Sequence, residues 1–365
     1  MKARITRSRT LRRTLAACAA LAMTVALAAP ALAADVTLQG QTIRFVIGLR
    51  PGGGTDLQAR LVGPYLTKYL PGNPRVVFNN MPGAGGMNAL NYIANAVKPD
   101  GLTIIAASAS DLNPRQLKSE QAKYDANTLG YIGGIAPAGT FLMIRKDALP
   151  RLADKSQPPV VVADADGLRS GVMMAAWGVL YLNWNLRWVL GYPGTSEMVL
   201  AVQRGEADLT ATAGIGHIHA MIETGQIVPI SQIGIFSEGK IVRRKAFPDV
   251  PLITELLEGK MDAEGAEAMR TWVPGNQIGK WFALPPGASP ELLATYRAAF
   301  DKVGQDPEFI RIGQQQIDPD FDTMSGKDVE DVAKLLANAS PESQRFMEGI
   351  GDKIASLRAT PTPAR

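Results

Sequence analysis

The sequence predicts an α/β fold with two domains, each built around a mainly parallel sheet. Strand-like apolar segments alternate with helix-like segments through short glycine loops, which is the pattern of parallel βαβ units. The chain has 365 residues, enough for two domains with hydrophobic cores. After the first thirty-three residues, no segment is long and apolar enough to span a bilayer.

Residues 1–33 have the pattern of a secretory signal peptide. Six basic residues precede an apolar, alanine-rich run from Thr14 to Ala29, and Ala33 ends a small-residue cleavage site. We therefore expect an exported, periplasmic protein cleaved near Ala33. Cleavage removes six positive charges and no negative ones, so the formal net charge changes from +4 to −2. No nucleic-acid partner is expected, because no basic patch remains.

The first strand–loop–helix unit carries the strongest pattern. Ile43–Ile47 has the β-branched and aromatic residues of a buried strand, and the glycines 52–54 follow it. Thr55 and Gln58 fit a capping box, so Thr55 is expected to be the N-cap of a helix. Backbone N–H groups at such a helix start can bind a small anion; an ordinary strand-to-helix turn is the alternative.

The same pattern repeats in the next thirty residues. A strand at 75–78 leads to a second glycine loop and to Asn88, the expected cap of a helix, and a third strand follows at 102–106. Ligands of open parallel sheets bind beyond the carboxyl ends of the strands, although simple turn chemistry is the alternative for the serines there. The segments expected to share one rim are Gly52–Gly54, Gly83–Gly86 and Ser108–Ser110.

The second domain is expected to begin with a strand at 141–144. Residues 164–171 are turn-rich, and Ser170 is placed to cap the helix that follows. The segment 227–235 has the pattern of a strand and is expected to return to the first domain. The segment 259–278 is expected to be irregular.

Four aromatic residues follow Ser170 at helical spacing. Their steps of four, three and four residues predict one face of a helix. A packing stripe and an aromatic wall for a ring-bearing ligand are the alternatives. The residues are Trp177, Tyr181, Trp184 and Trp188.

Enzyme motifs are missing from the sequence. It has no P-loop, no complete dinucleotide fingerprint and no Gly-x-Ser-x-Gly elbow. The only cysteine, Cys18, lies in the expected signal peptide, and His217 and His219 with Glu223 form a weak metal pattern. These observations favour a binding protein without a cofactor or metal. A secreted α/β hydrolase or isomerase, with Asp111 and His217 as its acid–base pair, is the alternative.

Six sequence blocks, in order, resemble the Bug/TctC family, the periplasmic solute receptors of tripartite tricarboxylate transporters. They are IRFVIGLRPGGGTDLQARL, NNMPGAGGMNALNYIANAVKPDGLTI, GEADLT, HIHAMIETGQI, RRKAFPDVPLITELL and WFALPPGASPELL. The resemblance covers most of the mature chain and implies a two-lobed periplasmic-binding-protein (Venus flytrap, type II) fold. It divides the chain into lobe 1, residues 34–142 and 238–365, and lobe 2, residues 143–237.

This resemblance implies a periplasmic receptor that captures a small organic acid between its lobes for inner-membrane permease subunits. A chemosensory receptor for a sensor kinase is the alternative, and we expect a monomer. In the family, two glycine loops hold a carboxylate, which by position points to Gly52–Thr55 and Ala84–Gly86. Lobe closure is expected to hinge near 139–143 and 234–240.

A set of residues is expected to contact the ligand on this basis. Arg50 or Arg169 is hypothesised to bind the distal acidic group of the ligand through two parallel hydrogen bonds. Pairing of these arginines with Asp56 or Asp166, or a solvated side chain, is the alternative. The whole set is Leu49, Arg50, Gly52, Gly53, Gly54, Thr55, Asp56, Ala84, Gly85, Gly86, Ser108, Ser110, Arg169, Ser170 and Thr212.

Overall fold

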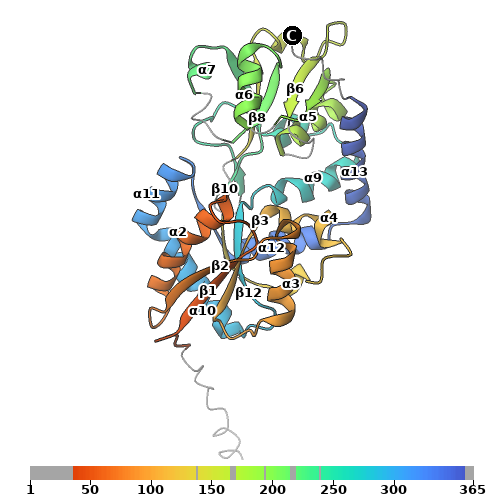
Figure 1. Cartoon of the computed structure of the whole chain (residues 1–365). Coiled ribbons are helices and arrows are strands. Elements are labelled where there is room, and N and C mark those ends of the chain that lie inside the picture. The colour runs from red at the N-terminus through yellow and green to blue at the C-terminus, as the bar shows by residue number, and fades with distance from the viewer. Residues whose placement is uncertain are drawn as a thin grey trace, which may run out of the picture. The chain divides into compact units, whose positions relative to one another are not determined.

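The computed structural model describes residues 36–136, 139–164, 170–192, 195–213, 219–237 and 240–357. The expected signal peptide and Arg169 lie outside these ranges. Leu38–Arg365 forms one compact unit that contains two large β-sheets surrounded by helices (Figure 1). Within the described ranges, none of the helices combines the length and the apolar character needed to cross a membrane.

The first sheet has six strands in the order β13-β4-β12-β3-β1-β2. β1 pairs in parallel with β2 and β3, whereas β12 runs antiparallel to β3 and β4. The register sets Ile47 beside Asn80 and Ala106, so the carboxyl ends of β1, β2 and β3 form one rim. The strands are β1 (Thr42–Ile47), β2 (Arg75–Asn80), β3 (Thr103–Ser108), β4 (Gly130–Ile135), β12 (Lys280–Leu284) and β13 (Thr323–Ser325).

Helices cover both faces of this sheet. On one face lie α2 (Gly54–Tyr69) and α10 (Pro290–Gln305), and on the other α3 (Met87–Ala96) and α12 (Gly326–Ala337). Phe282 lies between Phe45 and Phe300 of α10, at ring-centroid distances of 6.1 Å and 5.8 Å. Val46 faces the opposite way and packs in the core beneath α3 and α12. Burial on both sides explains the apolar run of β3, whereas the edge strand β2 alternates exposed and half-buried residues.

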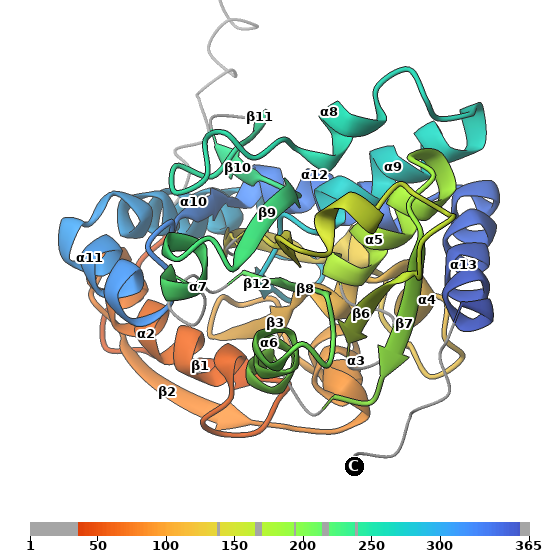
Figure 2. The same ribbon diagram turned by 90° about the horizontal axis from the view of Figure 1, so that it is seen from above.

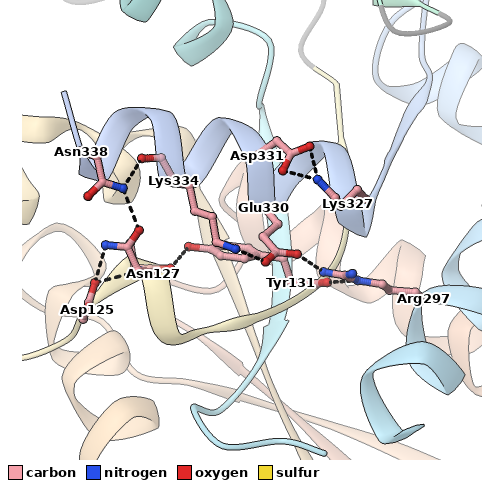
Figure 3. Close-up of polar contacts among 10 residues, drawn as sticks. Asp125, Asn127, Tyr131, Arg297, Lys327, Glu330, Asp331, Lys334 and Asn338 are labelled. Atoms are coloured by element: carbon pink, nitrogen blue, oxygen red, sulfur yellow. Dashed lines mark hydrogen bonds and ion pairs between the residues drawn. The ribbon is translucent and has the colours of Figure 1, made fainter. Parts of the chain in front are cut away.

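Polar contacts fix α12 above β4 and α10 (Figure 3). Arg297 of α10 donates from Nε to the carbonyl oxygen of Tyr131 at 2.9 Å and from Nη2 to Glu330 at 2.6 Å. Near the other end of the helix, Asn338 Nδ2 donates to Asn127 Oδ1 at 3.0 Å. The side chains of Arg297 and Glu330 are only 23% and 21% exposed, so their ion pair is partly shielded from water.

The second sheet has five strands in the order β7-β6-β8-β5-β9. β6 is parallel to β7 and β8, and β5 is antiparallel to β8 and β9. α5 (Ser170–Tyr181) packs on the face that carries Leu142 and Ile144, and α6 (Thr195–Arg204) on the opposite face (Figure 2). The strands are β5 (Phe141–Arg145), β6 (Val160–Asp164), β7 (Leu186–Leu190), β8 (Leu209–Thr212) and β9 (Ile227–Gln232).

Both sheets are therefore mixed, with parallel strands in their cores, and the predicted α/β class is confirmed. The long C-terminal helix α13 packs against α9 and α5, so Ile350 and Ile354 join the core beside the second sheet. The remaining elements are α4 (Pro114–Leu117), α7 (His219–Glu223), α8 (Ile253–Leu257), α9 (Ala263–Gly275), α11 (Pro307–Gln316), α13 (Pro341–Ser356), β10 (Ile235–Ser237), β11 (Lys240–Val242), and the 3-10 turns η1 (Ala84–Gly86), η2 (Ala109–Leu112), η3 (Ala126–Thr128) and η4 (Leu149–Arg151).

The helix predicted to carry the aromatic stripe is shorter than expected. α5 ends at Tyr181, and Asn183 adopts a positive φ of 58°, so Trp184 lies beyond the helix and Trp188 lies in β7. The packing role nevertheless holds, because the Trp177 ring lies 5.2 Å from that of Phe346 inside the core. The helical spacing of the aromatic residues therefore continues by chance beyond the point where α5 ends.

Two further expectations were wrong. β9 does not return to the first sheet, because it pairs antiparallel with β5 in the second. Residues 259–278 are not irregular: they contain α9, whose N-cap Asp262 accepts a hydrogen bond from the Gly265 N–H at 2.8 Å. The alanine- and glycine-rich composition of α9 concealed an apolar face that includes Met269 and Trp272.

Candidate functional site

The loops after β1, β2 and β3 meet at the rim of the first sheet. A Cβ atom on Gly48 would lie 3.0 Å from Cα of Gly86, and one on Gly86 would lie 2.7 Å from Oδ1 of Asp111. Gly86 also has a φ of 106°, which favours glycine. The main chains of the first two loops, and the side chain of Asp111 in the third segment, therefore approach as closely as their atoms permit.

The first loop ends in the open start of α2. Its N-cap is Gly53 rather than Thr55, so the predicted capping box does not form. Thr55 lies inside the first turn, and its buried hydroxyl has no hydrogen-bond partner among the residues that the structure describes. In the described part of the chain, the N–H groups of Gly54, Thr55 and Asp56 also lack acceptors. This helix start presents donors to solvent or to an anion.

Asp56 holds the first loop in this shape. Its carboxylate accepts hydrogen bonds from the Gly52 N–H at 2.9 Å, Arg60 Nε at 3.0 Å and Asn80 Nδ2 at 2.9 Å. The hydrogen bond from Arg60 contributes most to lowering the pKa of Asp56 to about 2. Asn80 also donates to the carbonyl oxygen of Leu49 at 3.0 Å. The geometry thus gives Asp56 a positioning role in the loop, with both carboxylate oxygens already engaged.

The second loop has four consecutive residues with positive φ angles. They are Gly83, Ala84, Gly85 and Gly86, with φ values of 141°, 47°, 66° and 106°. α3 begins at Met87, directly after Gly86, so Asn88 is not its cap as expected. Ala84 and Gly85 are exposed, and within the described residues their N–H groups have no acceptor. This loop therefore offers a second group of free main-chain donors.

The serine hydroxyls of the third segment donate their hydrogen bonds to acceptors within that segment. Ser108 Oγ donates to Asp111 Oδ2 at 3.1 Å, and the Ser108 N–H donates to the same oxygen at 2.7 Å. Ser108 Oγ also lies 2.7 Å from Ser110 Oγ. A hydroxyl carries one proton, so Ser110 must donate to Ser108. Neither serine then retains a proton for an anionic ligand while Asp111 is ionised.

Of the two arginines proposed to bind the ligand, the structure describes only Arg50. Arg50 is exposed and forms no ion pair among the described residues, whereas Asp56 pairs with Arg60. Arg169 lies outside the described ranges. Ser170 is the first residue of α5, and its side chain is not described. Thr212 lies apart from the glycine loops in sequence and sheet, as the last residue of β8 opposite Phe141.

One buried residue between the sheets escaped the sequence analysis. The Arg244 side chain is fully buried and donates to the carbonyl oxygens of Gly139 and Ala213 at 2.9 Å and 2.7 Å. It also pairs with Asp318 at 3.0 Å and Asp320 at 2.6 Å, just before β13. Arg244 thus joins the end of β8 in the second sheet to the edge of the first. In the sequence, it cannot be distinguished from a solvated arginine.

The metal pattern finds no support in the described residues. His217 lies outside them, and the side chain of His219 is not described. Elsewhere in the described ranges, no three His, Cys, Asp or Glu side chains gather in a way that could hold an ion.

Comparisons with known proteins find distant relatives over most of the chain. No family model matches the chain. A UPF0065 protein of Bordetella pertussis is 25% identical over 286 residues, covering 75% of this chain and 80% of that protein. A UPF0065 protein of Cupriavidus necator is 24% identical over 300 residues, covering 77% of this chain and 80% of the relative. The chain is thus similar to UPF0065 proteins over about three quarters of its length.

Solved structures confirm the two-lobed periplasmic-binding-protein fold of this chain. A TctC solute binding protein from Polaromonas has a TM-score of 0.65 and 18% identity, covering 87% of this chain and 100% of that chain. MatC from Rhodopseudomonas palustris, with bound malate, has a TM-score of 0.51 and 19% identity, covering 85% and 99%. Another R. palustris protein, with adipate, has a TM-score of 0.53 and 19% identity, covering 88% and 99%.

Proposed function

We propose that this protein, like the Bug/TctC family that it resembles, captures a small organic acid, here a dicarboxylate, in the periplasm for the membrane permease of a tripartite tricarboxylate-type transporter. The observation that carries the proposal is the set of unpaired N–H groups at the rim of the first sheet. They belong to Gly54, Thr55 and Asp56 of α2 and to Ala84 and Gly85 of the second loop. Support also comes from the relatives that hold malate and adipate, which are both dicarboxylates.

Binding energies favour a ligand enclosed from both sides. One helix N-terminus contributes about 0.3–1 kcal/mol to an exposed anion and up to ~2 kcal/mol to a partly buried one. Micromolar affinity requires about 8 kcal/mol. Several charge-assisted hydrogen bonds of about 1.5–3 kcal/mol each, shielded from water, would supply the difference.

We therefore propose that lobe 1, residues 34–142 and 238–365, closes on lobe 2, residues 143–237. The bending segments would be 139–143 and 234–240. Small-angle scattering should show a smaller radius of gyration with saturating ligand. An unchanged radius under those conditions would contradict closure.

A thermal-shift screen of the mature protein tests the proposed ligand class. A ligand that binds only the folded state raises the melting temperature, by an amount that grows with its concentration relative to Kd. Malate, adipate and their homologues should raise it, and diols of matched length should not. If no organic acid shifts the melting temperature and calorimetry detects no heat of binding, the proposed function is wrong.

Export and oligomeric state complete the proposal. We propose that residues 1–33 are removed during secretion and that the mature protein is a monomer. Mass spectrometry of the periplasmic fraction would measure the first property, and light scattering during gel filtration the second. A periplasmic protein that retains residues 1–33 would contradict cleavage. A stable dimer in solution would contradict the monomer.

A further inference from the structure

Lys280 lies at the rim of the glycine loops, although it belongs to a distant part of the sequence. It is the first residue of β12, which enters the sheet at this rim because it runs antiparallel to β3 and β4. The register places Lys280 directly opposite Ser108 on one side and Ile135 on the other. Directly opposite residues direct their side chains to the same face of a sheet. Lys280 therefore shares a face with the serine cluster.

The ammonium group of Lys280 lacks a partner among the described residues. Neither a hydrogen bond nor an ion pair engages it within the part of the chain that the structure describes, although its side chain is partly buried. Burial lowers the pKa of Lys280, and the charge of Asp111 opposes that change. A partly buried ammonium without an acceptor is unfavourable, so the site is suited to an anion that arrives from outside.

Asp111 attracts Lys280 but already has other partners. Its Oδ2 accepts hydrogen bonds from Ser108, and its Oδ1 accepts one from Gln116 Nε2 at 3.1 Å. Asp111 is only 1% exposed, so its charge holds Lys280 near the rim without offering a ligand any accessible oxygen. Since both serines donate inward, Lys280 is the charged donor that this cluster leaves for a ligand.

We propose that Lys280 binds the second carboxylate of the ligand and thereby makes this protein select dicarboxylates over monocarboxylates. The inference rests on the proposed function, in which the neutral amides of α2 and of the loop 84–85 hold the first carboxylate. Arg50 carries the same charge as Lys280 and lies close to that site in the sequence. Arg50 is exposed, however, so water screens its charge. The partial burial of Lys280 leaves its charge less screened.

Calorimetric titration of adipate and hexanoate into wild-type protein, Lys280→Gln and Lys280→Arg tests the inference. The two ligands have the same carbon chain and differ by one carboxylate. Lys280→Gln should weaken adipate binding about tenfold or more, the effect of losing one charge-assisted hydrogen bond, and leave hexanoate binding unchanged. Lys280→Arg, which keeps the charge, should retain the preference for adipate. Lys302→Gln, an exposed lysine in the last turn of α10, serves as the matched control.

The remaining outcomes each contradict a defined statement. Unchanged adipate affinity in a folded Lys280→Gln variant overturns the role of Lys280 and leaves the proposed function intact. Equal losses for adipate and hexanoate overturn the assignment to the second carboxylate. If wild-type protein binds no acid in the broader screen, the proposed function fails, and this inference fails with it. Circular dichroism and the melting temperature without ligand establish that each variant is folded.

Discussion

Gln277 is a buried residue whose side-chain amide has no hydrogen-bond partner among the described residues. It is 1% exposed, and within those ranges neither its Nε2 nor its Oε1 forms a hydrogen bond. Replacing an unsatisfied buried amide by an apolar group of similar shape removes its desolvation cost. We expect Gln277→Met to raise the free energy of unfolding by about 1–2 kcal/mol, measured by urea denaturation.

Gln116→Met is the matched control for that substitution. Gln116 donates to Asp111 at 3.1 Å, so its replacement should lower stability rather than raise it. A loss of stability in Gln277→Met as well would show that ordered water or a ligand satisfies Gln277.

Gly86 permits the contact between the first and second loops and Asp111. An alanine there would place Cβ 2.7 Å from Asp111 Oδ1 in a backbone conformation with φ of 106°. We expect Gly86→Ala to lower the free energy of unfolding by about 2 kcal/mol and to weaken acid binding. The control is Gly85→Ala, where φ is 66° but nothing lies within 4 Å of the added atom. Equal effects on stability and binding would mean that the contact with Asp111 is unimportant.

Asp56 should make stability depend on pH. Its pKa is lowered from 3.8 to about 2 in the folded state, so its stabilising effect is complete above the unfolded pKa and is lost as pH falls through the folded one. Asp56→Asn should cost about 1–2 kcal/mol at pH 7, less below about pH 4, and little near pH 2. Urea denaturation across this range measures the difference, and Asp331→Asn, in an exposed pair, is the control. A constant difference between pH 7 and pH 3 would contradict this assignment.

Among the elements, α12 depends on the ion pair between Glu330 and Arg297 (Figure 3). Burial raises the pKa of Glu330, but hydrogen bonds from Lys334 and Arg297 outweigh that effect, and the net shift is downward. Glu330→Ala leaves a partly buried guanidinium without its carboxylate. We expect a loss of about 1–3 kcal/mol in the free energy of unfolding.

Asp331→Ala provides a control on the same helix. Asp331 is 55% exposed and pairs with Lys327 one turn away, so its loss should change stability by less than about 0.5 kcal/mol. Equal losses for the two variants would contradict the role assigned to partial burial.

The sequence predicted the first three strands well. The segments 43–47, 75–78 and 102–106 overlap β1, β2 and β3, because short strand-like runs that lead into glycine loops and turns have few other solutions. The rim of glycine loops follows from that order.

Lys280 was missed because the rule used to find the rim considers the carboxyl ends of parallel strands. β12 is antiparallel and brings its first residue to the rim instead. The burial of Gln277 and Arg244 likewise depends on contacts between distant segments, which local sequence patterns do not contain.

At the scale of the whole molecule, Arg244 joins the two sheets. Its removal would leave Asp318 and Asp320 buried without their cation, and the carbonyl oxygens of Gly139 and Ala213 without a donor. We expect Arg244→Met to cost about 3–5 kcal/mol of unfolding free energy, the range found when one partner of a buried ion pair is removed. Thermal or urea unfolding would measure it.

The neighbouring arginine is a matched control for this experiment. Arg243 is 38% exposed and pairs with Glu255 at 2.8 Å, so Arg243→Met should cost about 1 kcal/mol or less. A similar small loss in Arg244→Met would mean that the buried cluster contributes little to holding the sheets together.

The open donors at Gly54, Thr55, Asp56, Ala84 and Gly85 belong to the peptide backbone. No point substitution, other than one to proline, deletes a peptide N–H from the chain. If these groups hold the acid, mutation can change which acid is preferred while the general capacity to hold acids persists. Divergent copies of such a gene could then acquire new nutrients through changes at a few flanking side chains, and directed evolution of this scaffold should begin at those positions.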